Sequence, residues 1–407
     1  MESYVITGIG IFNGLGSTAE SSWQSLLQGK SAIKPFSWPE DDPTKFPNTH
    51  SSLKTTIAGL SPKLQKDDIH PEHFDYGWPN WDPNTRACLM SVDEAITDSK
   101  LTSKNVGVVV STFGSGTSLR LEIFSALNNG KKKTSPKKSL NIGLDFPAAQ
   151  VSAIYGVTGP NTAMDSACTT GLTSIDHAVM TLKTNPDLDA MIVGGSDHIA
   201  EPIYMYWFQS LGALSPTGSQ PFDRNRSGFV MGEGAATMII EPLSKALARG
   251  AEIYGVIKST AFSTVFVSDT SPDPEGIGAR NCVTDALQRA DVKAEHIDFV
   301  NAHATSTPAG DQVEFDAMLD IVPGRTMVSN KGQIGHTMAG AGIVETIYTL
   351  QSMRDGQVPG TANLQDPCGE GMLLPTSKID LDIKYSIKNS FGFGGRNASM
   401  VLERYDR

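Results

Sequence analysis

The sequence predicts a layered α/β fold built from two similar halves, on three observations. The chain has 407 residues, enough for a large core and for two packed halves. Short β-branched runs alternate with longer segments in which apolar residues recur at helical spacing. The elements follow a similar order in the first and second parts of the chain, although the two parts do not visibly repeat in sequence.

The first half opens on a β-branched strand, "SYVITGIGIF", which runs into the turn "NGLG". A helix is expected in "STAESSWQSLLQG", which has Ser and Thr before the pattern and Gly after it. The stretch from Phe36 to Pro83 is rich in Pro, Trp and Asp, and we expect a long irregular surface region there. An amphipathic helix, "TRACLMSVDEAITDSKL", and a buried strand, "VGVVVST", follow it. "DLDAMIVGGSD" and "AATMIIEPL" are further strands, and "SKALARG" is a helix ending at Gly250.

The second half begins with the strand pattern "EIYGVIKSTAFST". A helix, "GARNCVTDALQRADV", and a strand, "IDFVNAHAT", come next. "GIVETIYTLQSM" is a further helix, and "YSIKNSFGFGGRNASMVLERY" indicates a strand, a glycine-rich turn and a final strand. The predicted halves are residues 1–250 and 251–407.

Composition and cysteine usage exclude several classes of protein. The formal net charge of −11 argues against nucleic acid as the main ligand, although a local basic docking patch remains compatible with it. The four cysteines are scattered and form no C-x-x-C pair, which disfavours a disulfide scaffold and a zinc site. No uninterrupted apolar run reaches the length of a bilayer span, and the N-terminus is a poor signal peptide. We therefore expect a cytoplasmic protein that contacts neither membrane nor nucleic acid.

Cys168, in "MDSACTTGL", is the first candidate for chemistry. Leu172, Ile175, Val179 and Leu182 recur at helical spacing after it, so Cys168 should sit at or just before a helix N-terminus. Free backbone N–H groups and the helix dipole stabilise a thiolate there. The alternative is a small apolar residue packed at a helix start, which is the commoner fate of a cysteine.

Two histidines and a glycine turn complete the set of candidates. His303 follows a strand in "NAHATSTPAGD", and strand ends are where sites collect in α/β proteins; it could equally be a surface or capping histidine. His336 lies between small residues in "SNKGQIGHTMAGAG" and could equally be a satisfied core histidine. "FGFGG" could turn a backbone N–H toward a ligand, or merely join two strands. It lacks the lysine and the following helix of a phosphate-binding loop.

Taken together, these motifs resemble one family, the elongating β-ketoacyl-acyl carrier protein synthases of the thiolase-fold superfamily. The matching stretches are "DSACTTG", "RSGFVMGEGAA", "NAHATSTPAGDQVE", "NKGQIGHTMAGAG" and "NSFGFGGRN", and they span nearly the whole chain. The resemblance implies a thiolase-like αβαβα core. It also implies an acyltransferase that loads an acyl chain onto its cysteine and elongates it by decarboxylative condensation with malonyl-carrier protein.

The resemblance also assigns roles to residues. Cys168 would be the nucleophile, and the backbone N–H groups of Cys168 and Phe393 would form an oxyanion hole. His303 and His336 would donate hydrogen bonds to the malonyl thioester oxygen. Lys331 and a buried glutamate, Glu314, would pair and fix the hydrogen bonding of the site. The hydroxyls of Thr305 and Thr307 would hold the pantetheine arm of the carrier protein, so the chain would need neither a metal nor a cofactor of its own.

The surroundings of the site follow from the same resemblance. The acyl pocket would be lined and gated by Gly114, Phe229, Phe391 and Phe393, with a small gate at Gly114 leaving room for stiff chains. The acyl carrier protein would dock on basic residues, for which the candidates are Lys131, Lys132, Lys133, Lys137, Lys138, Arg224 and Arg226. The lysines could equally form a solvated charged loop. The second subunit of a dimer would be a copy of this chain or a chain-length-factor-like partner.

Relatives within the superfamily differ in their partners for the cysteine. A thiolase carries a second cysteine near its C-terminal glycine turn, and "SFGFGG" has none. Initiating synthases use Cys-His-Asn, whereas His336 fills the third place here. Two alternatives stay open: an acyltransferase that does not elongate, and a non-catalytic partner subunit.

Three departures from the family pattern favour a specialised polyketide or polyene pathway over bulk fatty-acid synthesis. Ala304 replaces the usual glycine of "HGTSTP", and Arg396 follows "FGFGG" where Thr or Gln is usual. The loop "STVFVSDT" replaces a gating loop of different sequence.

Overall fold

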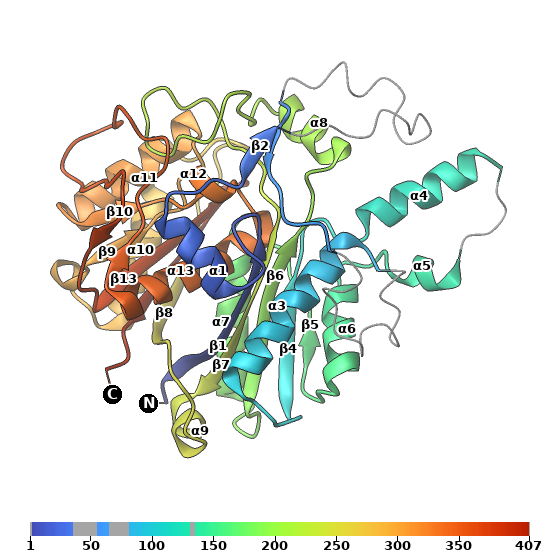
Figure 1. The fold of residues 1–407 in the computed structure, drawn as a ribbon. Coiled ribbons are helices and arrows are strands. Elements are labelled where there is room, and N and C mark those ends of the chain that lie inside the picture. Colours follow the sequence, from blue (N-terminus) through green and yellow to red (C-terminus); the bar gives the residue numbers. More distant parts are fainter. Residues whose placement is uncertain (1, 36–54, 65–80, 131–134, 407) are drawn as a thin grey trace.

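The computed structural model describes residues 2–35, 55–64, 81–130 and 135–406, apart from the side chains of Lys137 and Lys138. Strands and helices alternate along the chain as the sequence predicts (Figure 1). The strands are β1 (Tyr4–Asn13), β2 (Ile33–Pro35), β3 (Ile57–Gly59), β4 (Val106–Ser111), β5 (Asn161–Thr162), β6 (Ala190–Asp197), β7 (Gly234–Pro242), β8 (Gly255–Thr264), β9 (Phe299–Asn301), β10 (Thr326–Val328), β11 (Gln357–Val358), β12 (Ile379–Asp380), β13 (Tyr385–Gly392) and β14 (Arg396–Glu403). The α-helices are α1 (Ala19–Leu27), α3 (Pro83–Ser99), α4 (Thr117–Asn128), α5 (Pro136–Leu140), α6 (Phe146–Tyr155), α7 (Thr170–Thr184), α8 (Pro202–Ser210), α9 (Leu243–Ala248), α10 (Ile277–Ala290), α11 (Pro308–Ile321), α12 (Lys331–Ile334) and α13 (Ala341–Asp355).

Two five-stranded halves make up the main sheet of the described residues. Its strand order is β10-β9-β13-β14-β8-β1-β7-β6-β4-β5. If the five strands of each half are numbered in chain order, their order in the sheet is 3-2-4-5-1 in both halves, read from β10 to β8 and from β5 to β1. The pairing also repeats: the first two pairs of each half are parallel and the last two antiparallel. The two halves therefore share one topology. We infer that the boundary between them lies in the connection from α9 to β8, near residue 250.

The two faces of each half-sheet pack against different sets of helices, and this arrangement gives five layers. Along β6, Met191 and Val193 join the core around α7 and α13, whereas Ala190 and Ile192 join the core under α3 and α6. On the other half, residues of β14 alternate in the same way between the central core and a core under α10 and α11. The central layer is thus α7 with α13, enclosed by the two half-sheets and covered outside by helices (Figure 1). This is the predicted αβαβα core.

Glycines allow the layers to approach closely at two places. A Cβ on Gly10 of β1 would lie 2.1 Å from the Ser91 carbonyl oxygen of α3, which explains the glycines of "TGIG". In the central layer, a Cβ on Gly171 of α7 would lie 2.9 Å from the Cα of Gly342 in α13. Because α7 follows Cys168, this close contact helps to fix where the cysteine stands.

One prediction about the N-terminal half is wrong in its described part. Residues 55–64 of the expected irregular surface region contain β3, which pairs with β2, and Ala58 is fully buried. Gly59 lies against Gly232 and Ile334, so backbone packing rather than side-chain periodicity places this segment. Most of the remainder, residues 36–54 and 65–80, lies outside the described residues.

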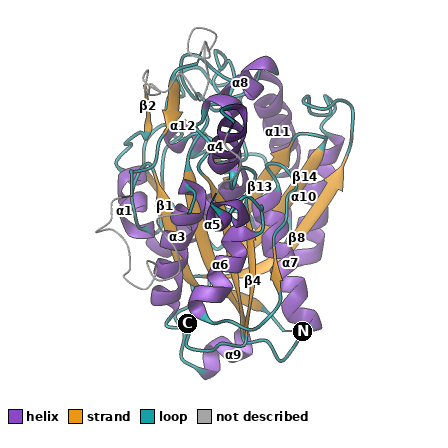
Figure 2. Ribbon diagram, turned by 90° about the vertical axis from the view of Figure 1, so that its right-hand side faces the viewer, coloured by secondary structure: helices purple, strands orange, loops and turns teal. Residues whose placement is uncertain are grey.

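Two short helices project from the body of the molecule. Helices α4 and α5 extend away from the layers in Figure 1, and α4 stands in front of the strands when the molecule is seen from that side in Figure 2. None of the helices in the described part of the chain is both long and apolar enough to cross a bilayer.

Candidate active site

Cys168 stands directly before helix α7, as the sequence predicts. Thr169 occupies the N-cap position without a side-chain capping hydrogen bond, and Ser166 donates its backbone N–H to Thr170 Oγ1 at 2.8 Å. Ala167 adopts a left-handed conformation with φ of 54°, which costs energy for a residue with a Cβ. Such conformations concentrate at functional sites because the surrounding structure must hold them. The strained turn aims the thiol into a cavity.

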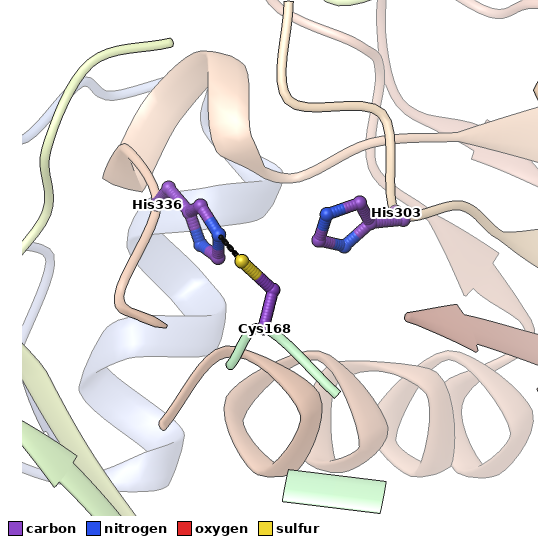
Figure 3. A group of neighbouring side chains, drawn as sticks. All are labelled: Cys168, His303 and His336. Atoms are coloured by element: carbon purple, nitrogen blue, oxygen red, sulfur yellow. Dashed lines mark hydrogen bonds between the residues drawn. The ribbon is translucent and has the colours of Figure 1, made fainter. Parts of the chain in front are cut away.

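His303 and His336 converge on that thiol from separate elements (Figure 3). His336, between α12 and α13, places Nε2 3.1 Å from Cys168 Sγ. His303 follows β9, and the centroids of the two imidazole rings are 5.4 Å apart. One donor atom from each of the three side chains lies within 4.8 Å of the other two. Residues that lie 33 to 168 positions apart in the sequence thus form one site.

The three donor atoms could hold a soft metal ion by geometry alone. Burial raises the pKa of the Cys168 thiol to about 11, which disfavours the thiolate that a soft metal ion would require as a ligand. The arrangement fits acid–base and nucleophilic chemistry better than metal binding.

A cavity of about 290 Å³ opens on the three side chains. Thr305 and Thr307 line it, with their hydroxyl oxygens 3.3 Å apart. Phe229, Phe391 and Phe393 line it as well. Phe229 meets the His336 ring edge-to-face at 5.7 Å, and Phe391 packs on His303 at 6.2 Å. The cavity therefore combines an apolar wall with a few convergent polar groups, as ligand sites commonly do.

The backbone N–H groups of Cys168 itself and of Phe393 both act to lower the pKa of the Cys168 thiol. The glycine turn allows a close approach: a Cβ on Gly392 would lie 3.2 Å from the Cys168 nitrogen. A pair of preorganised N–H donors beside a nucleophile is the arrangement that stabilises an oxyanion.

The protonation states at the site differ from one expectation. Burial raises the pKa of the Cys168 thiol to about 11, although Lys331 and the two N–H groups act to lower it. Desolvation therefore outweighs the stabilisation of a thiolate expected at the helix start. Burial, with a further contribution from Lys331, lowers the pKa of His303 and of His336 well below the usual range. The resting site holds a thiol and two neutral imidazoles.

The expected pair of Lys331 with Glu314 does not form. Lys331 Nζ contacts Glu345 Oε1 on α13, and both side chains are buried. Glu314 instead accepts the backbone N–H groups of His303 at 2.8 Å and Ala304 at 2.7 Å. Glu314 is buried as expected, but it holds the backbone that carries His303.

Comparisons with known proteins agree with this geometry. The sequence model of the β-ketoacyl synthase N-terminal domain matches residues 1–246, and that of the C-terminal domain matches residues 254–365. The chain is 33% identical to 3-oxoacyl-[acyl-carrier-protein] synthase 2 of Coxiella burnetii and 34% identical to that of Vibrio harveyi, each over 98% of both chains.

The chain belongs to the β-ketoacyl synthase family. A solved β-ketoacyl synthase from Burkholderia phymatum superposes with a TM-score of 0.86 at 26% identity over 100% of both chains. The ketosynthase/chain length factor of ishigamide superposes with a TM-score of 0.87 at 23% identity over 100% of both chains, and this likeness concerns the fold. The thiolase-like fold is confirmed.

Gly114 of this β-ketoacyl synthase does not gate the cavity. It is absent from the cavity lining among the described residues, and a Cβ there would lie 2.1 Å from Ile199 Cγ2. Its backbone N–H donates to Asp197 at 2.9 Å, so the glycine serves a tight turn. The expected small gate at this position is wrong; the aromatic residues Phe208 and Phe229 form the wall instead.

The predicted docking residues have different fates. Arg226 is buried, and its guanidinium donates to the carbonyl oxygens of Thr307, Asp223 and Pro308. It therefore braces the cavity loop and cannot present a charge to a partner. Arg224 is exposed, with 60% of its side chain accessible, and its Nε lies 3.5 Å from Asp366 Oδ1. Lys131, Lys132 and Lys133 lie outside the described residues, and so do the side chains of Lys137 and Lys138 in α5.

Sequence reasoning missed two charged residues of the site, Glu345 and Lys388. Glu345 is the only charged residue in "AGIVETIYTLQSM", and a lone carboxylate in an apolar helix is a usable signal. Lys388 sits in the strand pattern "YSIKNSFG", where alternation alone does not reveal a buried ammonium.

Proposed function

We propose that this β-ketoacyl synthase is a condensing enzyme that elongates an acyl chain delivered by an acyl carrier protein. The observation that carries the proposal is the Cys168–His336 contact of 3.1 Å in a cavity that also holds His303 and two oxyanion donors. The names of the bacterial relatives, 3-oxoacyl-[acyl-carrier-protein] synthase 2, support the same reaction. The phosphopantetheine belongs to the carrier protein, and the chain supplies no cofactor of its own.

The first step is transfer of the acyl group. Cys168 Sγ attacks the thioester carbonyl of the acyl-carrier protein, its proton passes to the departing carrier thiol, and the carbonyl oxygen takes negative charge. The N–H groups of Cys168 and Phe393 receive that charge. Neutral His336 can accept the thiol proton through Nε2, which compensates for the high pKa of the buried thiol.

The second step is loss of CO2 and carbon–carbon bond formation. The bond to the malonyl carboxylate breaks, and its electron pair forms an enolate whose charge lies on the thioester oxygen. Neutral imidazoles at His303 and His336 can donate hydrogen bonds to that oxygen. The enolate carbon then attacks the acyl-Cys168 carbonyl, the C–S bond breaks to release the Cys168 thiolate, and the thiolate takes up a proton from solvent.

Separate measurement of CO2 release and of elongated product tests this order of events. Cys168→Ala should abolish elongation, because no acyl-enzyme forms. Cys168→Gln should still decarboxylate malonyl-carrier protein, because that step needs the histidines rather than the nucleophile. Elongation at a normal rate by Cys168→Ala would overturn the proposal. Decarboxylation that persists unchanged in a His303→Gln/His336→Gln variant would remove the role of the histidines.

The partner subunit covers the projecting helices in this proposal. Phe124 and Leu127 of α4 are 63% and 61% exposed, and Leu140 of α5 is 75% exposed. Strand β5, at the open edge of the main sheet, belongs to the same half. Exposed apolar side chains of this kind mark an interface. The second subunit is a copy of this chain or a chain-length-factor-like subunit, and Phe124→Asp should yield a monomer in light scattering whereas Leu247→Asp on α9 should not.

In this proposal the acyl chain enters the cavity and lies against its aromatic wall. Two aromatic residues of the cavity lining, Phe208 and Phe229, meet edge-to-face at 5.3 Å. Outside the lining, Trp207 stacks on Phe208 at 5.0 Å and on Phe113 at 5.5 Å. Flat conjugated chains pack on such a wall better than flexible saturated ones, which favours a polyketide or polyene pathway. Faster loading of Cys168 by saturated than by conjugated chains of equal length would contradict it.

A cytoplasmic location fits the four free cysteines.

A further inference from the structure

Lys388 of β13 is a fully buried lysine beside the active site. Its Nζ lies 2.9 Å from Glu345 Oε2 and also contacts the Asn389 carbonyl oxygen. Lys331 Nζ contacts the other oxygen of the same carboxylate. One buried glutamate is thus held between two ammonium groups.

Four buried titratable groups from four elements lie together here. Lys331 begins α12, Lys388 lies in β13, Glu345 lies in α13 and Glu314 lies in α11. Glu314 also acts on Lys388, and it is tied to β13 through Asn389 Nδ2 at 3.1 Å. Burying an ammonium carries a large desolvation cost, so a lysine is retained in such a place only where partners compensate it. Here Glu345 contacts both lysines, and Glu314 acts on Lys388 without contacting it.

The same charges face the two histidines. Lys331 and Lys388 both disfavour protonation of His303 and of His336. Among the described residues, the other titratable groups beside the histidines are Cys168, His336 for His303, and Glu314, which accepts the backbone N–H of His303. Removing Lys388 would leave two glutamates against one lysine, and the excess negative charge would favour imidazolium ions. An imidazolium cannot accept the Cys168 proton.

We propose that Lys388 is a positioning residue for the condensation: it fixes Glu345, and through Glu345 the side chain of Lys331, beside the two catalytic histidines. This inference deepens the proposed function, on which its catalytic part rests. Lys388 touches neither the thiol nor a histidine, so it acts through the other charges. A merely structural lysine would stabilise the fold without influencing how the histidines titrate.

The test is a pH titration of His303 and His336 in Lys388→Met. The titration is monitored by NMR of enzyme labelled with 13C in the histidine rings. Signals are assigned with His303→Gln and His336→Gln. Loss of one buried positive charge should raise both titration midpoints by about one pH unit. The acid limb of malonyl-carrier protein decarboxylation should move upward with them, and kcat should fall about tenfold or more while KM changes little.

Two further variants separate the alternatives. Arg249→Met is the matched control, because it also strips a cation from a buried glutamate, Glu241, away from the active site. It should lower stability and leave the histidine titrations unchanged. If Lys388→Met folds poorly, Lys388→Met/Glu345→Gln removes both charges of the pair. It should restore the wild-type titration midpoints while kcat stays low, because Lys331 has lost its anchor.

Unchanged histidine titrations in Lys388→Met would overturn the proposal, whatever happens to the rate. Equal shifts in Arg249→Met would overturn it as well. The titration needs no substrate, so it tests Lys388 even if the wild-type enzyme fails to decarboxylate malonyl-carrier protein. Failure of the wild-type enzyme to decarboxylate malonyl-carrier protein would instead overturn the proposed function.

Discussion

Two histidines that stay neutral in the folded protein should make its stability depend on pH in a calculable way. The pKa of His303 and of His336 is lowered in the folded state, chiefly by burial. A base whose folded pKa is depressed stabilises the protein above its unfolded pKa, and that stability is lost as the pH falls below it. We therefore expect the free energy of unfolding to decline as the pH drops below 6.5.

The size of the effect follows from the unfolded chain alone, provided that neither folded imidazole takes up a proton. An unfolded histidine with a pKa of 6.5 gains about 1.4 kcal/mol of protonation free energy between pH 7.5 and pH 5.5. Two such histidines give about 2.7 kcal/mol over the same interval. Carboxylates and the remaining histidines add their own pH dependence, so a comparison with a variant is required.

Urea unfolding at pH 7.5 and pH 5.5 provides the comparison, with wild type beside His303→Gln/His336→Gln. The substitution removes both titrating groups and keeps a polar side chain at each position. Wild type should lose about 2.7 kcal/mol more than the variant on acidification, and each single variant should lie midway. An equal loss in wild type and in the double variant would show that the folded histidines titrate normally, and the neutral-imidazole mechanism would fail.

Three further substitutions test the layers, the cavity wall and the docking surface. Gly171→Ala would place a Cβ 2.9 Å from Gly342 Cα, so the central helices must part; we expect a loss of about 1–3 kcal/mol in urea unfolding and slower alkylation of Cys168 by iodoacetamide. Gly114→Ile would collide with Ile199 rather than narrow the cavity, so it should lower Tm without changing which acyl lengths load onto the enzyme. Arg224→Glu should raise KM for the carrier protein, with a smaller effect at high salt, whereas an unchanged KM would exclude this exposed arginine from docking.

Much of the fold could be predicted from the sequence because local patterns carry it. The strand "VGVVVST" and the helix "TRACLMSVDEAITDSKL" correspond to β4 and α3, since alternation and helical spacing are each set within a few residues. The shared topology of the two halves was only suggested by element order. The close contact of Gly171 with Gly342 depends on the meeting of two helices far apart in sequence, which no local pattern reports.

The active site divides in the same way. Cys168, His303 and His336 lie in motifs whose combination marks a family, so their convergence could be expected before any coordinates. The partner of Lys331 could not, because only the packing of α13 selects Glu345 over Glu314. Arg226 resembled a docking residue in sequence, yet three backbone carbonyl groups enclose its guanidinium.

The most direct test of the condensing reaction is a single turnover followed by mass spectrometry. The enzyme is incubated with acyl-carrier protein, digested, and the peptide containing Cys168 is weighed; malonyl-carrier protein is added to a parallel sample. The account predicts an acyl thioester on Cys168 that disappears as one CO2 is released and a 3-oxoacyl chain, longer by two carbons, appears on the carrier protein. Acyl transfer from Cys168 without CO2 release, or an elongated product without an acyl group ever residing on Cys168, would contradict it.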